Sequence, residues 1–434
     1  MSERWQNWAR LESARPTRTV TPPDVEAVAA EVVRARAAGE SVKMVGSGHS
    51  FTAIAAPEHT LLRPEGLQGV VAVDREAMTV TARAGTRLDD FNRSLEHLGL
   101  SLHNMGDIAE QTLAGAVSTG THGTGGVAAG LAAQVVGLEL VTGTGEVLRA
   151  SATEHPEVLE MARVGLGALG VLTSLTFAVE PLFALEARER PMGWDEALAR
   201  YDELTAEHHH VDLYWWPHTD GLLVKTNTRL ADLDDLRPVP RLQGWVDDEL
   251  LANRVLGAGL AAANLVPRAT APFNRTVTRL VPDRTYSDVA HRVFTSHRGV
   301  VFREMEYAVP RAAGLTALRE ARAALEASGV QVGMPVEVRC APADDIPLST
   351  GAGRDSLYLA FHTHHRADHA RYFAAVESVM RAHEGRPHWG KLHTRQADGL
   401  AALYPRFGDF LAMRDRLDPD RVFANPYLRR VLGP

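Results

Sequence analysis

Cysteine is almost absent from this sequence of 434 residues, because Cys340 stands alone. No disulfide can form within the chain, so packing has to stabilise it, and a chain of this length can bury a large core. Long apolar runs are missing as well. The longest, residues 255–266, falls short of the roughly 20 residues that span a bilayer. We expect a buried helix there and no membrane segment.

An excess of basic residues is also missing. The 46 lysines and arginines are outnumbered by 54 aspartates and glutamates, and the formal net charge is −8. Nucleic-acid-binding domains carry basic patches, so this balance argues against nucleic acid as a partner. The first residues are polar and lack the apolar core of a signal peptide, so we expect a cytoplasmic protein. The oligomeric state stays open.

Short β-branched runs broken by glycine fill the first part of the chain, with helical stretches between them. The expected strands cover residues 41–45, 69–73, 78–84, 135–141 and 171–179, and the expected helices cover residues 23–38, 87–98 and 156–164. After Pro181 the glycine density falls. Longer helices are expected over residues 312–328 and 367–384, and strands over residues 331–340 and 356–364. The pattern predicts the α+β class.

Two glycine-rich segments are candidates for a cofactor site. The first, VGSGHSF at residues 45–51, follows an expected strand, and its Gly46-Ser47-Gly48 offers unhindered backbone N–H groups that suit a pyrophosphate. The second covers residues 111–126, where the glycine density rules out a helix and suits a planar ligand against backbone. A tight turn explains either segment alone. Two such segments, each with a histidine, favour a cofactor site.

A third glycine segment, GLGALG at residues 165–170, matches the G-x-G-x-x-G pattern of dinucleotide-binding folds. That pattern requires a strand before the loop and a helix after it. Here the expected order is helix then strand, so we reject a Rossmann interpretation. Backbone contact between this turn and a cofactor stays open.

The motifs together resemble a known family. VGSGHSF, NMGDIAEQTLAGAVSTGTHGTG and GLGALGVLTSLTF resemble the FAD domain of vanillyl-alcohol-oxidase-type flavoproteins, and VEVR, PHWGK and DPDRVFANPYL resemble the branch of aldonolactone oxidases and alditol oxidases. The resemblance runs along nearly the whole chain. It implies a PCMH-type FAD-binding domain over residues 1–180 and an α+β substrate domain over residues 181–393. The last segment, residues 394–434, is then expected to pack back on the FAD domain.

In this family the histidine of the first loop is joined covalently to the 8α-methyl group of FAD, and His49 matches it. Some relatives add a second link from a cysteine in the FAD domain, but Cys340 lies far downstream, so a single link is implied. The plain alternative is that His49 only caps its loop. The resemblance further assigns contacts with FAD to Val45, Gly46, Ser47, Gly48, Ser50, Phe51, Gly106, Thr112, Gly115, Thr119, Gly120, Thr121, His122, Leu172 and His388.

Glu337 and Arg339 lie two apart on an expected strand and therefore point to the same face. A surface ion pair is one explanation, but their neighbours are apolar and indicate a buried strand, where charges need partners. By resemblance this pair lines the substrate pocket, and Lys391 approaches the same pocket. We expect Arg339 and Lys391 to stabilise developing negative charge. Glu337 is expected to orient the substrate hydroxyl and help remove its proton.

A cluster of histidines at positions 362, 364 and 365 raises the question of a metal. His362 and His364 share one face of a strand, and with Glu337 they could satisfy zinc. We expect no metal, because the resemblance places His362 against the substrate instead. A second cluster, residues 208–210, is expected on a solvated helix end without a role.

Three positions distinguish the two branches of the resemblance. At 362 lactone oxidases have histidine and alditol oxidases threonine; alditol oxidases also have histidine where this chain has Ala360 and serine where it has Asp107. These residues favour oxidation of a sugar-1,4-lactone such as L-gulono- or D-arabinono-1,4-lactone, by hydride transfer from a carbinol C–H to FAD. The alternative is an alditol oxidase acting on xylitol or sorbitol. A flavin-binding protein without catalysis is a third possibility, and the combination of Glu337, Arg339 and Lys391 argues against it.

The expected electron acceptor is oxygen, which would make hydrogen peroxide. In the family, the residue at position 106 lies beside the flavin C4a carbon, and glycine there leaves the approach of oxygen open. The alternative is that Gly106 only serves a backbone turn with Asp107.

Overall fold

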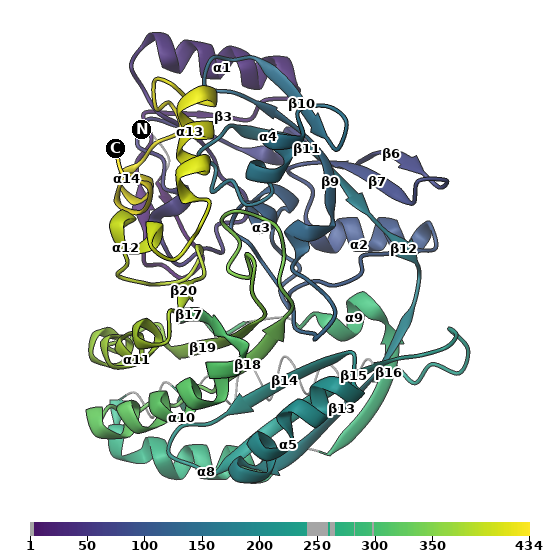
Figure 1. The fold of residues 1–434 in the computed structure, drawn as a ribbon, viewed down its shortest axis with the longest axis vertical. Helices are drawn as coiled ribbons and strands as arrows, with labels where there is room; N and C mark the ends of the chain where they lie inside the picture. The colour runs from purple at the N-terminus through teal and green to yellow at the C-terminus, as the bar shows by residue number, and fades with distance from the viewer. Residues whose placement is uncertain (1–3, 241–258, 261–264, 282, 297–298) are drawn as a thin grey trace.

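The computed structural model describes residues 4–240, 259–260, 265–281, 283–296 and 299–434. Figure 1 shows two halves, one above the other. The upper half contains the beginning of the chain and its C-terminal helices, and the lower half contains the segment between them. Among the described residues, no helix is long and apolar enough to cross a membrane.

The upper half contains a three-stranded parallel sheet and a five-stranded antiparallel sheet. The parallel sheet has the order β3 (Arg18–Val20), β5 (Thr60–Leu62), β4 (Val42–Met44). The antiparallel sheet has the order β10 (Val147–Ser151), β9 (Val135–Val141), β11 (Val171–Ala178), β7 (Thr79–Arg83), β6 (Val70–Asp74). The helices are α1 (Val25–Ala37), α2 (Leu88–His97), α3 (Leu113–Ser118) and α4 (Pro156–Ala162), and the short pairs are β1 (Trp5–Gln6) with β2 (Ser13–Ala14) and β8 (Leu100–Ser101) with β12 (Glu180–Pro181).

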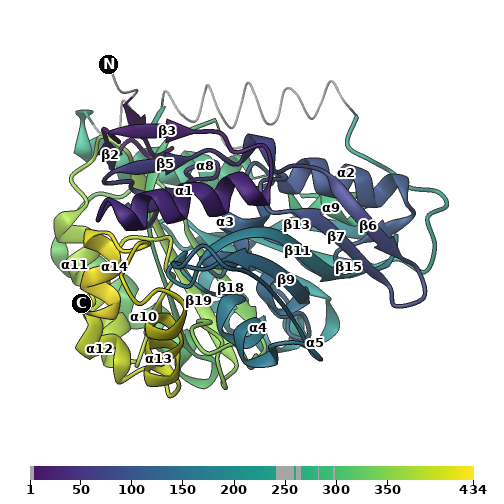
Figure 2. The same cartoon turned by 90° about the horizontal axis from the view of Figure 1, so that it is seen from above.

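The C-terminal helices belong to the upper half. They are α12 (Ala397–Ala401), α13 (Phe407–Leu417) and α14 (Pro426–Leu432). Leu400, Phe410 and Leu428 are buried in the same hydrophobic core as Phe91 and Phe177. Figure 2 shows these helices beside α1, and Arg36 Nε at the end of α1 lies 2.5 Å from Asp420 Oδ2.

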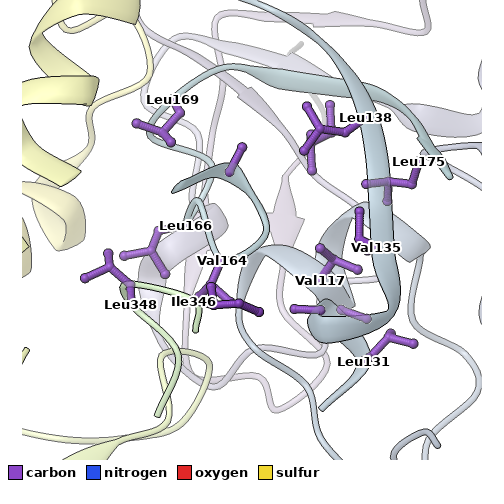
Figure 3. Close-up of a cluster of buried hydrophobic side chains, with 14 of the residues drawn as sticks. Val117, Leu131, Val135, Leu138, Val164, Leu166, Leu169, Leu175, Ile346 and Leu348 are labelled. Carbon is purple, nitrogen blue, oxygen red and sulfur yellow. The ribbon is translucent and has the colours of Figure 1, made fainter. Parts of the chain in front are cut away.

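A loop from the lower half also enters this core. Ile346 and Leu348 follow β18 and pack with Val164 and Leu166 (Figure 3). Both loop side chains are 1% exposed, and burial of such a side chain contributes roughly 1.5–3 kcal/mol. The two halves are therefore joined by packing as well as by the chain.

The lower half is one eight-stranded antiparallel sheet; most of its helices cover the face away from the upper half, and one short helix (Ala290–Phe294) lies on the face toward the upper half. Its order is β16 (Arg284–Val289), β13 (Ala184–Gly193), β15 (Gly221–Arg229), β14 (His210–Trp215), β18 (Val336–Ala341), β19 (Ser356–His364), β17 (Phe302–Pro310), β20 (Arg386–Pro387). The helices are α5 (Trp194–Glu207), α8 (Thr270–Leu280), α9 (Ala290–Phe294), α10 (Arg311–Ser328) and α11 (Ala370–Ala382).

Side chains alternate between the two faces of each strand, so each central strand serves two purposes. In β18, Val336, Val338 and Cys340 join the core under α5, α10 and α11, while Glu337 and Arg339 point to the opposite face. In β17 and β19 the same alternation places the apolar residues in that core and leaves a polar face toward the upper half.

The α+β prediction is confirmed, and most expected elements lie within a few residues of the observed ones. The strand expected over 331–340 begins only at Val336. The prediction that residues 111–126 contain no helix was wrong, because α3 forms at Leu113–Ser118, where Thr112 caps it and a single glycine interrupts the run. The prediction of a solvated end for residues 208–210 was wrong for His210, which starts β14 and is 1% exposed. Most of 255–266 lies outside the described residues; of those described, Leu260 is buried and Leu265 is exposed.

Candidate active site

Two cavities meet at His49. The first has an empty volume of about 1060 Å³ and runs between the glycine segments of the upper half. The second has an empty volume of about 740 Å³ and lies between the upper half and the polar face of the large sheet. Both are lined by His49, Ser50, Gln111 and Thr119. Together they form one elongated site.

Glycines shape the first cavity. A Cβ atom at Gly46 would lie 2.2 Å from Thr112 Oγ1, so no other residue fits there without displacing Thr112. Gly48 has a φ of +70°, a backbone conformation that favours glycine. Among the described residues, none accepts a hydrogen bond from the backbone N–H groups of Gly46, Ser47 or Gly48. These donors suit a pyrophosphate.

The ring of His49 lies at the junction of the cavities. It stacks on Trp8 with ring centroids 5.6 Å apart. Burial lowers the pKa of the His49 ring below its ordinary value; Glu110 opposes this shift, while Lys391 and Arg87 add to it. The ring is therefore neutral near pH 7, and one nitrogen keeps its lone pair.

Distant parts of the chain hold the loop of His49 in place. The backbone N–H of Phe51 donates to the carbonyl of Gly390 over 2.6 Å, and Asn7 donates to the carbonyl of Ser50. The amide of Asn425 donates to the carbonyls of Ala53, Ile54 and Ala56.

The second cavity is bounded by a set of side chains that we call the polar wall, from neighbouring strands of the large sheet. The polar wall consists of Glu304, Glu306, Glu337, Arg339 and His362. All are at most 9% exposed. Buried charges have to be paired, and each of them has a partner.

Arg339 is held by several carboxylates. Its Nη2 lies 2.6 Å from Glu337 Oε1 and 3.5 Å from Asp107 Oδ2, and its Nε lies 3.0 Å from Asp212 Oδ1. Burial lowers the pKa of Arg339, but Glu337, Asp107 and Asp212 together raise it by more than burial lowers it. The net pKa is therefore well above its ordinary value. Burial raises the pKa of Asp212 to about 6, against the opposing effect of Arg339. Arg339 is thus a fixed cation whose charge is largely balanced.

Lys391, Glu304 and His362 form a second network. The ammonium of Lys391 donates to Glu304, and His362 Nε2 lies 3.5 Å from Glu304 Oε1. Burial raises the pKa of Glu304, but Lys391 and His362 more than offset it, and the pKa falls to about 2. Glu304 is therefore an anion at every pH near neutrality.

A third network joins His122, Glu306 and His388. Their ligand atoms lie within 4.8 Å of one another, a spacing that would suit a metal ion. The hydrogen bonds argue against one: Nδ1 of His388 accepts the N–H of Gly390, so a neutral ring carries its proton on Nε2 and cannot ligate through it. Burial lowers the pKa of His388 to about 4, so this ring is neutral. Glu306 Oε1 lies 3.2 Å from His122 Nε2.

The predicted site residues come together with two exceptions. All the residues assigned to FAD line one of the two cavities except Val45, whose N–H donates to Leu62, and Gly120. Asp107 and His362 line the second cavity, as do Glu337, Arg339 and Lys391. The zinc alternative is not supported, because His364 does not line this cavity and Nδ1 of His362 is hydrogen-bonded to the carbonyl of Pro335.

Sequence reasoning missed Glu304, Glu306 and Asp212. The signal was present in REMEYAVP, where two glutamates alternate with apolar residues as Glu337 and Arg339 do in VEVR. It also missed Lys43, which lines the first cavity and whose Nζ donates to the carbonyl of Gly167 over 3.2 Å. Burial lowers the pKa of Lys43 to about 7, against Asp418 and Glu58.

Gly106 lines the second cavity and is tightly packed. A Cβ atom there would lie 3.0 Å from Thr121 Cγ2 and 3.1 Å from the carbonyl oxygen of His122. A larger residue at this position would therefore require Thr121 or the backbone of His122 to shift slightly.

The chain is similar to known proteins along its whole length. A family model described as D-arabinono-1,4-lactone oxidase matches residues 175–431, and one described as FAD binding domain matches residues 16–151. The chain is 39% identical over 434 residues to L-gulono-1,4-lactone dehydrogenase of Mycobacterium tuberculosis, covering 100% of both chains. It is 32% identical over 435 residues to L-gulonolactone oxidase of Bos taurus, covering 99% of this chain and 98% of that protein.

Two further proteins widen the comparison. Alditol oxidase of a Streptomyces species is 32% identical over 447 residues, covering 100% of both chains. The solved structure of cholesterol oxidase from Brevibacterium sterolicum matches with a TM-score of 0.86 at 18% identity, covering 100% of this chain and 97% of that one. At that identity the likeness shows the fold alone.

Proposed function

The chain belongs to the D-arabinono-1,4-lactone oxidase family of FAD-binding proteins, and from this premise we propose that it oxidises a hydroxyl group of a sugar-1,4-lactone of the L-gulono or D-arabinono type. The observation that carries the proposal is the continuous site, in which a glycine-lined cavity opens at His49 into a cavity with buried charges. Bound FAD supplies the two-electron acceptor for the hydride of the carbinol carbon.

FAD fits the residues present. The free backbone donors of residues 46–48 suit its pyrophosphate, and the glycines of the first cavity leave room for a ligand against backbone. His49 is neutral and lies where both cavities meet, so we assign to it a single covalent link with the flavin. The test is acid precipitation: the wild-type pellet stays yellow, and His49→Ala releases its flavin into the supernatant. A colourless wild-type pellet would remove the covalent link from the proposal.

The polar wall then binds the sugar. Glu337 orients the reacting hydroxyl, and Arg339 and Lys391 stabilise negative charge as the proton leaves. The two cations come from different networks, so each can be tested separately.

We propose a lactone rather than an open-chain polyol as the substrate. In the strand register Ala360 lies opposite both Glu306 and Glu337, so the residue between the two glutamates adds no polar group for a further hydroxyl. The 32% identity with an alditol oxidase favours the polyol as the second candidate. Anaerobic bleaching of the flavin by a panel of sugar-1,4-lactones, xylitol and sorbitol decides between them. We expect bleaching by a lactone at concentrations at which polyols leave the flavin oxidised.

We propose oxygen as the electron acceptor, with hydrogen peroxide as product, because Gly106 adds no side chain to the cavity wall. The relatives include both oxidases and a dehydrogenase. Stopped-flow mixing of the reduced enzyme with air-saturated buffer tests this directly. Reoxidation over many minutes, with fast turnover only on a dye or a cytochrome, would make the protein a dehydrogenase.

A further inference from the structure

We propose that His362 accepts the proton of the substrate hydroxyl and that Glu304 positions its ring and sets its proton affinity. The inference rests on the proposed oxidation of a carbinol in the second cavity and specifies which side chain takes the proton.

The protonated nitrogen of His362 is fixed by a hydrogen bond. Nδ1 lies 2.9 Å from the carbonyl oxygen of Pro335, which can only accept, so Nδ1 carries the hydrogen. A neutral ring then has its lone pair on Nε2. The ring is further held edge-on by Phe302, with centroids 5.3 Å apart.

Nε2 lies on the side of the ring where Glu304 lines the cavity, 3.5 Å from its Oε1. That separation is long for a hydrogen bond. The carboxylate itself is fixed by Lys391, so it can stabilise an imidazolium without moving. His362 and Glu304 are opposite each other in the register of β19 and β17.

The other candidate bases of the polar wall are engaged. Glu337 accepts from Arg339 over 2.6 Å, and Glu306 faces His122 at 3.2 Å. One oxygen of Glu337 is therefore occupied by the guanidinium. Burial raises the pKa of Glu306, but His122 more than offsets this and holds the pKa below its ordinary value.

The histidines of the other network are engaged as well. His388 accepts from Gly390 on Nδ1, so a neutral ring has no lone pair left on Nε2. His122 has Nδ1 against the carbonyl of Gly123 and Nε2 against Glu306. Among the described histidines of the second cavity other than His49, Nε2 of His362 is the nitrogen best placed to receive a proton.

The step balances. The O–H bond of the substrate breaks and its proton goes to Nε2 of His362. Bound FAD would accept the hydride that carries both electrons of the C–H bond, and a carbonyl would then remain on the substrate. His362 returns the proton to solvent before the next turnover.

The charged groups facing His362 come from three elements: Glu304 on β17, Glu337 on β18 and Lys391 in the loop after β20. Burial lowers the pKa of His362, but Glu304 and then Glu337 raise it by more, so the net pKa is above its ordinary value of 6.5. The reactive form is the neutral ring. The rate of flavin reduction should therefore rise with pH, with an inflection above that of a free histidine.

The decisive variant is His362→Asn, whose amide can still donate to Pro335 but cannot take a proton. We measure the rate of anaerobic flavin reduction by a saturating lactone from pH 5 to 9. In His362→Asn this rate should no longer rise with pH and should be lower than in the wild type by about 10²-fold or more. In Glu304→Gln the rate should still rise with pH, but the inflection should lie about one pH unit lower than in the wild type. His364→Gln, on the same strand but outside the cavity, is the matched control and should leave the profile unchanged.

A second readout is independent of turnover. Histidine-selective ¹⁵N NMR of the oxidised holoenzyme should show one ring whose signal disappears in His362→Asn and whose pKa falls in Glu304→Gln. The flavin content of each variant, measured by absorbance, checks that the protein has folded.

The outcomes separate the two proposals. If no lactone or polyol bleaches the wild-type flavin, the proposed function fails. Suppose instead that a lactone bleaches the flavin, and that the rate of flavin reduction in His362→Asn still rises with pH and stays within a few-fold of the wild-type rate. The assignment of His362 is then overturned while the proposed function stands. If Glu304→Gln leaves both the inflection of the pH–rate profile and the pKa of the His362 ring unchanged, the role of Glu304 is overturned.

Discussion

The two cavities that meet at His49 are built in opposite ways. The first is lined largely by loops, with glycines at positions such as Gly46 and Gly85 where a Cβ atom would collide with its neighbours. The second is bounded on one side by strands, whose charged side chains are buried and paired. The first cavity is therefore sensitive to added volume, whereas the second is sensitive to lost charge.

The largest effect expected from this difference is at Gly46. In Gly46→Val, the added side chain overlaps Thr112, whose hydroxyl also caps α3. We expect purified protein with almost no FAD, measured by absorbance. Gly408→Ala is the control, because a Cβ atom there meets nothing within 4 Å. Normal FAD content in Gly46→Val would contradict the volume-sensitive description of the first cavity.

The next effect concerns charge in the second cavity. Lys391→Met and Arg339→Leu should each slow flavin reduction by about 10²-fold or more while FAD content changes little. Arg339→Leu also leaves Glu337 and Asp212 without their cation, so it should lower the melting temperature as well. Lys391→Arg keeps the charge and should recover part of the rate. Rates within a few-fold of wild type would exclude these cations from the reaction.

The smallest of the three effects is the acid stability of the polar wall. Glu304 has a pKa of about 2 in the folded protein against an ordinary 4.5, so its contribution is present above pH 4.5 and is lost as the pH falls toward 2. Between pH 5 and 3 the wild type should lose on the order of 1–2 kcal/mol more unfolding free energy than Glu304→Gln.

Urea unfolding of the His49→Ala protein after its unlinked flavin has been removed, at both pH values and with and without Glu304→Gln, measures this difference. Glu65→Gln removes an exposed carboxylate and is the control. Equal losses with and without Glu304 would show that the buried pair contributes nothing to acid stability.

The difference between the two cavities also explains which site residues could be predicted from the sequence. Many residues that line the first cavity come from short contiguous segments, because a site formed by backbone needs several glycines close together in the chain. Such a segment, VGSGHSF, can be recognised directly in the sequence. The polar wall is distributed over three strands, with one or two residues from each, and alternation hides those residues among apolar ones. Spacing on an expected strand indicated that Glu337 and Arg339 share a buried face, but their place in the substrate pocket rested on the resemblance.

Pairing was beyond sequence reasoning altogether. The partners of Arg339 come from Asp107, Asp212 and Glu337, which lie in a loop and two strands, and only the folded sheet brings them within 3.5 Å. The charge balance of the wall therefore could not be deduced from the motif that contains Arg339. His210 was misjudged for a related reason, because a run of three histidines resembles a solvated end, whereas the third begins a buried strand.

The closure of the His49 loop by Gly390 and Asn425 has a consequence for the order of assembly. Asn425 is synthesised 372 residues after Ala53, whose carbonyl it binds. While the chain is still on the ribosome, the flavin site has all of its glycine motifs but lacks the segment that fixes the reactive loop. The covalent link that we propose at His49 would therefore form only after this segment has been synthesised. A chain that ends before Asn425 would contain the glycine motifs but lack the contacts that hold the His49 loop.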